Sequence, residues 1–363
     1  MSPTVRRYQR RTFLALAGAS AAVACLGSTE APSPSPEPAT PSASPSPRAA
    51  LTGTLVVYSA LEESTTDELL AAFAKADPGV RMDLAALAAA DELETRLRVE
   101  QKARKADLFV GGASAYHDAL GKDAILEPYV SATSALVPSA LKERTGLWTG
   151  WYEDVLGLVV NTERVTKELP AKPASWDDLL DPAWRGKLIV PDPVRTDAGF
   201  VFLATQLFRF GRDETKTMDY LKQLHANVAQ YPGDVAQVVA MVARGDAAGA
   251  PSWGHDVLAD ATRKPGLQML APRDAGLEIG AVSIVKGTAS TAAARAFVEW
   301  VGGRDAQAIV ARIGGRAPTR VLTPAPAGAP SLAGLDPTRF DRRIASDVRQ
   351  RLLARWRDAT GRA

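Results

Sequence analysis

The sequence has a single cysteine among its 363 residues, Cys25, close to the N-terminus. From residue 26 onward the chain therefore carries no thiol. Thiolates are the groups that bind zinc, hold iron–sulfur clusters and attack as cysteine nucleophiles. Their absence excludes these kinds of site from everything after residue 25.

Histidine is also scarce. The three histidines, His117, His225 and His255, share no spacing that is typical of metal ligands. A nucleophile elbow, a phosphate-binding P-loop and an H-E-x-x-H motif are all missing from the sequence. We therefore expect no catalytic residues, no metal site and no cofactor, and the class of enzymes is disfavoured.

No basic stripe interleaved with aromatic residues occurs, so nucleic acid is not an expected partner. The formal net charge of +2 includes four arginines before residue 12, namely Arg6, Arg7, Arg10 and Arg11. Without them the chain has a slight excess of acidic residues. The charge balance is that of an ordinary globular protein.

The N-terminus has the pattern of an export signal. An apolar run at residues 13–23 follows the arginines and is short for a membrane span but typical of a signal peptide. Residues 10–14, RRTFL, resemble a twin-arginine signal, and an ordinary secretory signal is the alternative. We predict a signal peptide over residues 1–24.

Cys25 follows Ala22, Val23 and Ala24, which together resemble a lipobox. This predicts lipidation of Cys25 through a thioether, and a chance cysteine at the end of the signal peptide is the alternative. The segment that follows, up to residue 50, is rich in Pro, Ser and Ala and has almost nothing to bury. It is predicted to be a disordered tether that holds the folded body off a membrane surface.

The body of the chain alternates strand and helix patterns. Short apolar strands are predicted at 55–58, 80–84 and 106–110, with helical periodicity between them, which indicates a mostly parallel α/β sheet. A further strand at 187–190 must stop at Pro191 and Pro193. Thr196 or Asp197 then caps a long apolar helix, an arrangement that presents backbone N–H groups to a ligand.

Several motifs resemble those of one family. They are VYSALEE at 57–63, ADLFVGGAS at 106–114, WTGWYEDVLGLVVNT at 148–162, SWDDLLDP at 175–182, WRGK at 184–187, PDP at 191–193 and LLARW at 352–356. In this order they resemble the periplasmic solute-binding proteins of bacterial ABC importers, in the branch for iron(III), phosphonates, thiamine and polyamines. The resemblance covers residues 55 to about 356.

The resemblance implies the two-lobed periplasmic-binding-protein fold of type 2. Each α/β lobe would be a mixed, mostly parallel sheet flanked by helices, and a hinge would join the lobes. Residues 148–160 and 277–285 would be the two crossing strands. Lobe one is predicted over 51–153 plus 281–315 and lobe two over 154–280 plus 316–363, with a docking helix at 341–357.

The resemblance also implies a ligand cleft between the lobes, formed by loops that follow strands. The predicted ligand-binding residues are Ser59, Ala60, Leu61, Gly112, Ala113, Ser114, Arg195, Thr196, Asp197, Tyr231, Asp234, Ser252, Trp253 and Asp256. His255 belongs to the last of these loops.

Two departures from the family bear on the ligand. Relatives that bind bare ferric ion carry tandem tyrosines where this chain has Ser252 and Trp253. Indole supplies no oxygen ligand, so we expect Trp253 to line the cleft and contact an organic solute instead. Phosphate-binding relatives tend to show Ser-Gly-Thr where this chain has Thr196, Asp197 and Ala198, so Asp197 brings a carboxylate to the start of this helix. It is either a simple N-cap or, if it faces the cleft with Asp234 and Asp256, a feature that favours a cation.

The function implied is that of an extracytoplasmic substrate-binding lipoprotein, located in the periplasm or at the cell surface. A monomer would close on a small polar or charged solute and deliver it to an ABC permease and its ATPase, touching the membrane only through the anchor. Binding of ferric iron or an iron chelate is the alternative ligand. An extracytoplasmic enzyme or sensor is the alternative of another class.

Overall fold

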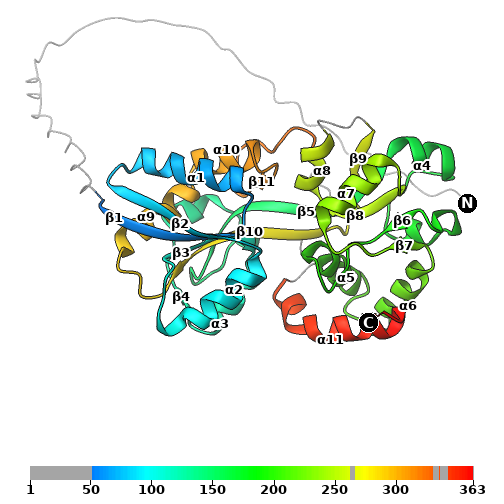
Figure 1. Cartoon of the computed structure of the whole chain (residues 1–363), viewed down its shortest axis with the longest axis horizontal. Helices are drawn as coiled ribbons and strands as arrows, with labels where there is room; N and C mark the ends of the chain where they lie inside the picture. Colours follow the sequence, from blue (N-terminus) through cyan, green and yellow to red (C-terminus); the bar gives the residue numbers. More distant parts are fainter. Residues whose placement is uncertain (1–50, 262–265, 330–334, 336–341, 363) are drawn as a thin grey trace, which may run out of the picture. The chain divides into compact units, whose positions relative to one another are not determined.

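The computed structural model describes residues 51–261, 266–329, 335 and 342–362 (Figure 1). The predicted signal peptide, Cys25 and the tether lie outside the described residues. The described strands form one mixed sheet in the order β2-β1-β3-β10-β5-β8-β6-β7. Their bounds are β1 Gly53–Ser59, β2 Val80–Leu87, β3 Leu108–Ala113, β5 Thr149–Asn161, β6 Leu188–Ile189, β7 Val228–Gln230, β8 Gly249–Trp253 and β10 Gly276–Val285.

Three short strands complete the sheet beside the central pair. β4 (Leu126–Glu127) pairs with β10, whereas β9 (Leu267–Leu270) and β11 (Ala317–Pro318) pair with β5. β1 is parallel to both β2 and β3, and β6 is parallel to both β7 and β8. The predicted mixed, mostly parallel α/β architecture is confirmed.

The long strands β5 and β10 connect the two halves of the molecule. They run antiparallel, pairing from Gly276 opposite Leu156 to Val282 opposite Thr149. Tyr152 and Glu153 of β5 pair with β11, and the last residues of β5 pair with β8 and β9. Figure 1 shows both strands passing from one half to the other. The strands predicted at 148–160 and 277–285 are therefore confirmed as crossing strands.

In the first half, helices lie on both faces of the sheet formed by β1, β2 and β3. The helices are α1 Glu63–Ala76, α2 Ala90–Val99, α3 Ser114–Lys122, α9 Thr291–Val301 and α10 Arg304–Arg312. Val57 packs with α1 and α9 in one core cluster, while its neighbour Tyr58 packs with α2 in another. Alternating side chains of a strand point to opposite faces, so one strand serves both cores.

The second half surrounds a buried helix, α5 (Asp197–Arg209), whose Phe202 and Leu203 are almost wholly inaccessible. Its other α-helices are α4 Thr162–Glu168, α6 Glu214–His225, α7 Val235–Arg244, α8 Gly254–Ala261 and α11 Arg342–Thr360. Short 3-10 helices occur at Glu100–Lys102, Ala132–Leu136, Ser139–Leu141, Asp177–Leu180 and Pro182–Trp184.

The last helix, α11, is a docking helix as predicted. Leu352, Leu353 and Trp356 join the core cluster that surrounds α5. The helix also contacts α3 of the first half, where Lys122 forms an ion pair of 2.6 Å with Asp347. α11 therefore lies along the second half, and its first turns reach α3 of the first half (Figure 1). Of the helices in the described ranges, none combines the length and apolar character needed to cross a membrane.

Candidate functional site

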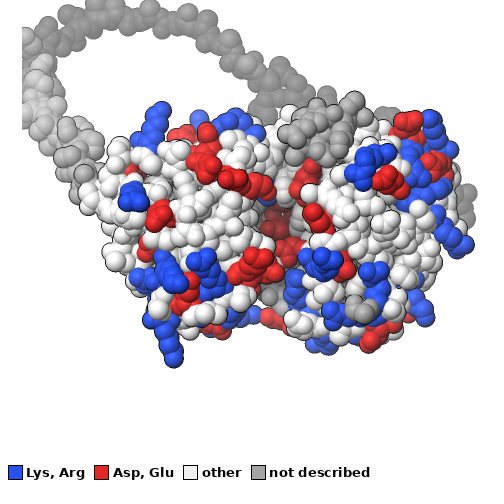
Figure 2. Space-filling view, in the orientation of Figure 1, with Lys and Arg blue, Asp and Glu red and all other residues white. Residues whose placement is uncertain are grey.

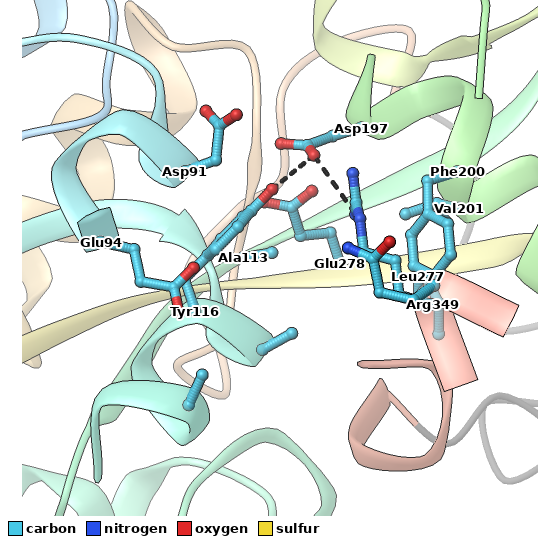
Figure 3. A pocket seen from close by; sticks show the side chains of 13 residues that line it. Asp91, Glu94, Ala113, Tyr116, Asp197, Phe200, Val201, Leu277, Glu278 and Arg349 are labelled. Atoms are coloured by element: carbon cyan, nitrogen blue, oxygen red, sulfur yellow. Dashed lines mark hydrogen bonds and ion pairs between the residues drawn. The ribbon is translucent and has the colours of Figure 1, made fainter. Parts of the chain in front are cut away.

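A cavity of about 280 Å³ lies where α2, α3, α5, β10 and α11 come together (Figure 3). Its polar lining includes four acidic side chains, from Asp91, Glu94, Asp197 and Glu278. Both halves of the molecule contribute to it, because α2 and α3 belong to the first half and α5 and α11 to the second. The full lining is Asp91, Glu94, Ala113, Ala115, Tyr116, Ala119, Asp197, Phe200, Val201, Leu277, Glu278, Arg349 and Gln350.

Asp197 projects into this cavity because another residue caps its helix. Thr196 is the N-cap of α5, and its side chain accepts a hydrogen bond of 3.0 Å from Gly199 N. The carboxylate of Asp197 is left to accept a hydrogen bond of 2.5 Å from the Tyr116 hydroxyl across the cleft. Burial raises the pKa of Asp197 above its ordinary value, although Tyr116 and Arg349 act in the opposite direction.

Glu278 lies on the crossing strand β10. Burial, together with the nearby carboxylates of Asp197 and Asp154, raises the pKa of its carboxyl group to about 8. At neutral pH this group is therefore mostly protonated, and a cation placed beside it would favour its ionised form. The ionisation of Glu278 therefore depends on whether a positively charged group occupies the cavity.

The remaining wall of the cavity is apolar and aromatic, with Phe200, Val201 and Leu277 on one side. The guanidinium carbon of Arg349 lies 4.2 Å from the centre of the Phe200 ring. Figure 3 shows this side chain between Asp197 and Phe200. An aromatic face beside carboxylates is a suitable environment for an organic cation.

A second group of charges lies beside the cavity, and we call it the crossing cluster: Glu62, Asp154, His255, Asp256 and Arg316. Arg316 donates hydrogen bonds of 2.6 and 2.8 Å to the two oxygens of Glu62, and its Nη2 lies 3.0 Å from His255 Nε2. His255 Nδ1 contacts the carboxylate of Asp154. The cluster joins α1, β5 and the start of α8.

The members of the crossing cluster shift each other's pKa values. Burial opposes ionisation of Glu62, yet Arg316 lowers the pKa of this carboxylate to about 2. Burial and Arg316 lower the pKa of His255, but the carboxylates of Asp154 and Asp256 outweigh them and raise it. The pKa of Asp256 is raised by burial. Positive charge in this cluster is thus already paired within the protein.

Acidic residues gather at the centre of the molecule in Figure 2, where the two halves meet. Glu278 connects the cavity to the crossing cluster, since its carboxyl group interacts with Asp197 on one side and with Asp154 and Arg316 on the other. The field at the junction is therefore dominated by carboxylates. Within the described ranges, no group of three or more His, Cys, Asp or Glu side chains has the geometry to hold a metal ion.

The structure places three of the predicted binding residues at this junction. Ala113 and Asp197 line the cavity, and Asp256 belongs to the crossing cluster. The loops after β1 and β3 lie beside each other, because a Cβ on Gly112 would lie 2.6 Å from Ala90 Cβ and 3.5 Å from Ala60 Cβ.

Three more predicted residues of these loops are buried, namely Ser59, Leu61 and Ser114. The Ser59 hydroxyl lies 2.8 Å from Thr66 Oγ1 and accepts a hydrogen bond from Leu61 N. Ser59 and Leu61 therefore shape the first half rather than line the cavity.

The other predicted residues lie outside the cavity lining. Thr196 caps α5, and Arg195 is exposed beside Gly233. Tyr231 packs against Trp356, with ring centres 5.5 Å apart. Asp234 is exposed and caps α7 by accepting a hydrogen bond from Ala236 N.

Ser252 and Trp253 are the last two residues of β8, and both are buried. Trp253 is 6% exposed and belongs to the core cluster around α5. It pairs with Leu156 of β5, which directs it into the core rather than to the cavity. Trp253 does not line this cavity, in which Phe200 provides the aromatic face.

Sequence reasoning missed most of the polar groups of the cavity and of the crossing cluster. Glu278 and Asp154 could have been found, because a carboxylate inside a continuous apolar strand is rarely buried without a role. Asp91 and Glu94 are three residues apart on one helix and share a face, which is a weaker signal. Arg349 has no local signal, since an arginine on an amphipathic helix is ordinary.

Comparison with known proteins agrees with this geometry. Residues 103–336 match the model of a family described as bacterial extracellular solute-binding protein. The iron uptake protein A2 of Synechocystis is 25% identical over 275 residues, which cover 71% of this chain and 76% of that protein. A probable ABC transporter periplasmic-binding protein of Sinorhizobium fredii is 27% identical over 233 residues, covering 62% of this chain and 64% of the relative.

A solved structure shares the fold as well. The periplasmic binding protein AfuA from Actinobacillus pleuropneumoniae, with exogenous fructose-6-phosphate bound, is 26% identical. It superposes with a TM-score of 0.75 and covers 85% of this chain and 99% of its own. The predicted type 2 periplasmic-binding-protein fold is confirmed.

Proposed function

Because the chain belongs to the family of bacterial extracellular solute-binding proteins, we propose that it captures a small, positively charged organic solute in the cavity between its halves. The captured solute would then be handed to the permease and ATPase of an ABC importer, in keeping with the name of the Sinorhizobium relative. The family and these relatives bind solutes and are not enzymes. One observation carries the choice of ligand: four acidic residues line the cavity, against one arginine.

The ligands named for two relatives fit this cavity less well. A sugar phosphate, as in the AfuA structure, would bring its anion to Asp197 at the start of α5, where the carboxylate already occupies the favourable end of the helix dipole. Iron would need several oxygen ligands, and the Tyr116 hydroxyl is engaged with Asp197. Burial and Asp197 also raise the pKa of Tyr116, which opposes formation of a phenolate.

Isothermal titration calorimetry with four probes tests the ligand class: butylammonium, butyrate, fructose 6-phosphate and ferric citrate. We expect heat of binding with butylammonium alone. Asp197→Asn should weaken this binding by about tenfold or more, because it removes a carboxylate from a partly desolvated site. Asp234→Asn is the matched control, since Asp234 is exposed and Asn also caps helices well. Binding of fructose 6-phosphate or ferric citrate without butylammonium would refute a cation site.

We further propose that the protein is an exported monomer, anchored by a lipidated Cys25. The lipobox-like residues before Cys25 and the Pro- and Ser-rich segment after it support this proposal. Cells that express Cys25→Ala should release the protein into the soluble extracytoplasmic fraction, while the wild type stays with membranes. Equal membrane association of both proteins would contradict the anchor.

A further inference from the structure

The guanidinium group of Arg349 lies inside the cavity and is only loosely held there. Its Nη1 is 3.9 Å from Asp197 Oδ1, and its side chain keeps 30% of its surface exposed. With the residues that the structure describes, Arg349 forms no hydrogen bond. A guanidinium carries five N–H donors, so most of its binding capacity is unused.

Neighbouring arginines are held much more firmly. Arg316 is buried and bonded to both oxygens of Glu62. On α11 itself, Arg351 and Arg355 form ion pairs of 2.8 and 2.7 Å with Glu214. Together with the buried Leu352, Leu353 and Trp356, these pairs anchor the helix independently of Arg349. The Arg349 side chain can therefore leave the cavity while α11 stays in place.

The surroundings of Arg349 suit a cation and not an anion. Asp91, Glu94, Asp197 and Glu278 line the same cavity, so an anion entering beside Arg349 would meet four acidic side chains. The ring of Phe200 offers its negative face to a flat positive group at 4.2 Å. Arg349 is therefore a poor contact for an anionic ligand.

We propose that Arg349 occupies the position in which the ligand's own cationic group binds, and that this group is a planar guanidinium or amidinium. The inference rests on the proposed function, because it assumes that the cavity is the solute site. A planar, weakly hydrated cation stacks on an aromatic ring better than a strongly hydrated ammonium does. A ligand has to displace Arg349, so Arg349 lowers the affinity for weak cations and sets the selectivity of the site.

Calorimetric titration of Arg349→Ala with butylguanidinium tests this competition. In the wild type the ligand has to displace the Arg349 side chain from its loose ion pair and its cation–π contact. The variant lacks this competing side chain, so its affinity for butylguanidinium should be about 5- to 30-fold higher than that of the wild type. Arg357→Ala is the matched control: it removes one positive charge from the exposed side of the same helix and should leave the affinity unchanged. In Arg349→Ala, butylguanidinium should also bind more tightly than butylammonium.

Three results would overturn the inference. The first is an affinity for butylguanidinium that is unchanged, weaker or undetectable in Arg349→Ala. The second is butyrate binding that disappears in Arg349→Ala, which would make Arg349 a contact for an anion. The third is equal affinity of Arg349→Ala for butylguanidinium and butylammonium, which would reject the planar class. If Asp197→Asn weakens cation binding while Arg349→Ala has no effect, the cation site stands and only the role of Arg349 fails. If neither variant alters binding, the proposed function fails as well.

Discussion

At the scale of the residue, the most informative group is a carboxyl that folding places in an unfavourable environment. Glu278 sits in the crossing strand β10, and burial together with Asp197 and Asp154 raises its pKa from 4.5 to about 8. A folded-state pKa above the ordinary value means that the folded protein binds the proton more tightly than the unfolded chain. The stability that depends on this proton is complete below pH 4.5 and is lost as the pH rises to about 8.

Glu278→Gln should remove this dependence, because glutamine resembles the neutral acid in shape. We expect the variant and the wild type to be similar in stability at pH 4.5, and the variant to be more stable at pH 9. The gap should grow by at most about 1.4 kcal/mol per pH unit between these limits. Urea denaturation at pH 5, 7 and 9 measures this difference in the free energy of unfolding. Glu92→Gln is the control, because Glu92 is exposed. Parallel pH profiles for Glu278→Gln and the wild type would contradict the raised pKa of Glu278.

At the scale of the element, the start of α5 decides how the cavity is charged. Asp192, Pro193 and Thr196 form the turn that precedes the helix, and the Thr196 hydroxyl donates to Asp192 O at 2.8 Å. A Cβ on Gly199 would lie 2.4 Å from Pro191 O, so the turn and the first helical turn pack closely. This local geometry holds Asp197 at the first position of the helix, with its carboxylate toward Tyr116.

Thr196→Ala should therefore damage both stability and binding. Loss of an N-cap costs about 1 kcal/mol of unfolding free energy, within a usual range of roughly 0.5–2 kcal/mol. Weaker binding of butylammonium should accompany it, because a frayed helix start no longer positions Asp197. Thr196→Ser keeps a capping hydroxyl and should preserve both properties. Thermal denaturation and calorimetry on the two variants compare them, and wild-type behaviour of Thr196→Ala would show that the cap is dispensable.

At the scale of the whole molecule, β5 and β10 are positioned to act as a hinge. The pairing of β10 with both neighbours is irregular next to Gly280, where a Cβ would lie 1.8 Å from the Tyr152 ring. Such irregularities weaken the ladder locally and let strands bend. The crossing cluster, which joins Glu62 and Arg316 to His255, lies close to the same strands and links the two halves.

Binding of a cation should bring the halves closer together, since Asp91 and Glu94 belong to one half and Asp197 to the other. Small-angle X-ray scattering should show a smaller radius of gyration on saturation with butylguanidinium. Asp197→Asn at the same probe concentration is the control and should show little change. A radius of gyration that stays constant in a sample shown by calorimetry to be saturated would exclude closure.

Much of the architecture could be predicted from the sequence because it depends on local signals. Apolar runs bounded by turns marked β1, β3 and the two crossing strands, and the apolar spacing of Val348, Leu352 and Trp356 marked the docking helix. The prolines and the two candidate caps, Thr196 and Asp197, marked the start of α5, and the structure shows that Thr196 is the cap. Each of these signals acts over a few residues, so no knowledge of distant contacts was needed.

The charge of the site was decided only by the tertiary structure. Asp91, Asp197, Glu278 and Arg349 come from four different elements and meet only because β10 and α11 return to the junction late in the chain. Burial and mutual repulsion of carboxylates depend on distances in space, and spacing along the sequence does not report them. For the same reason the sequence could not show that Trp253 packs in the core while Phe200 and Arg349 share the cavity.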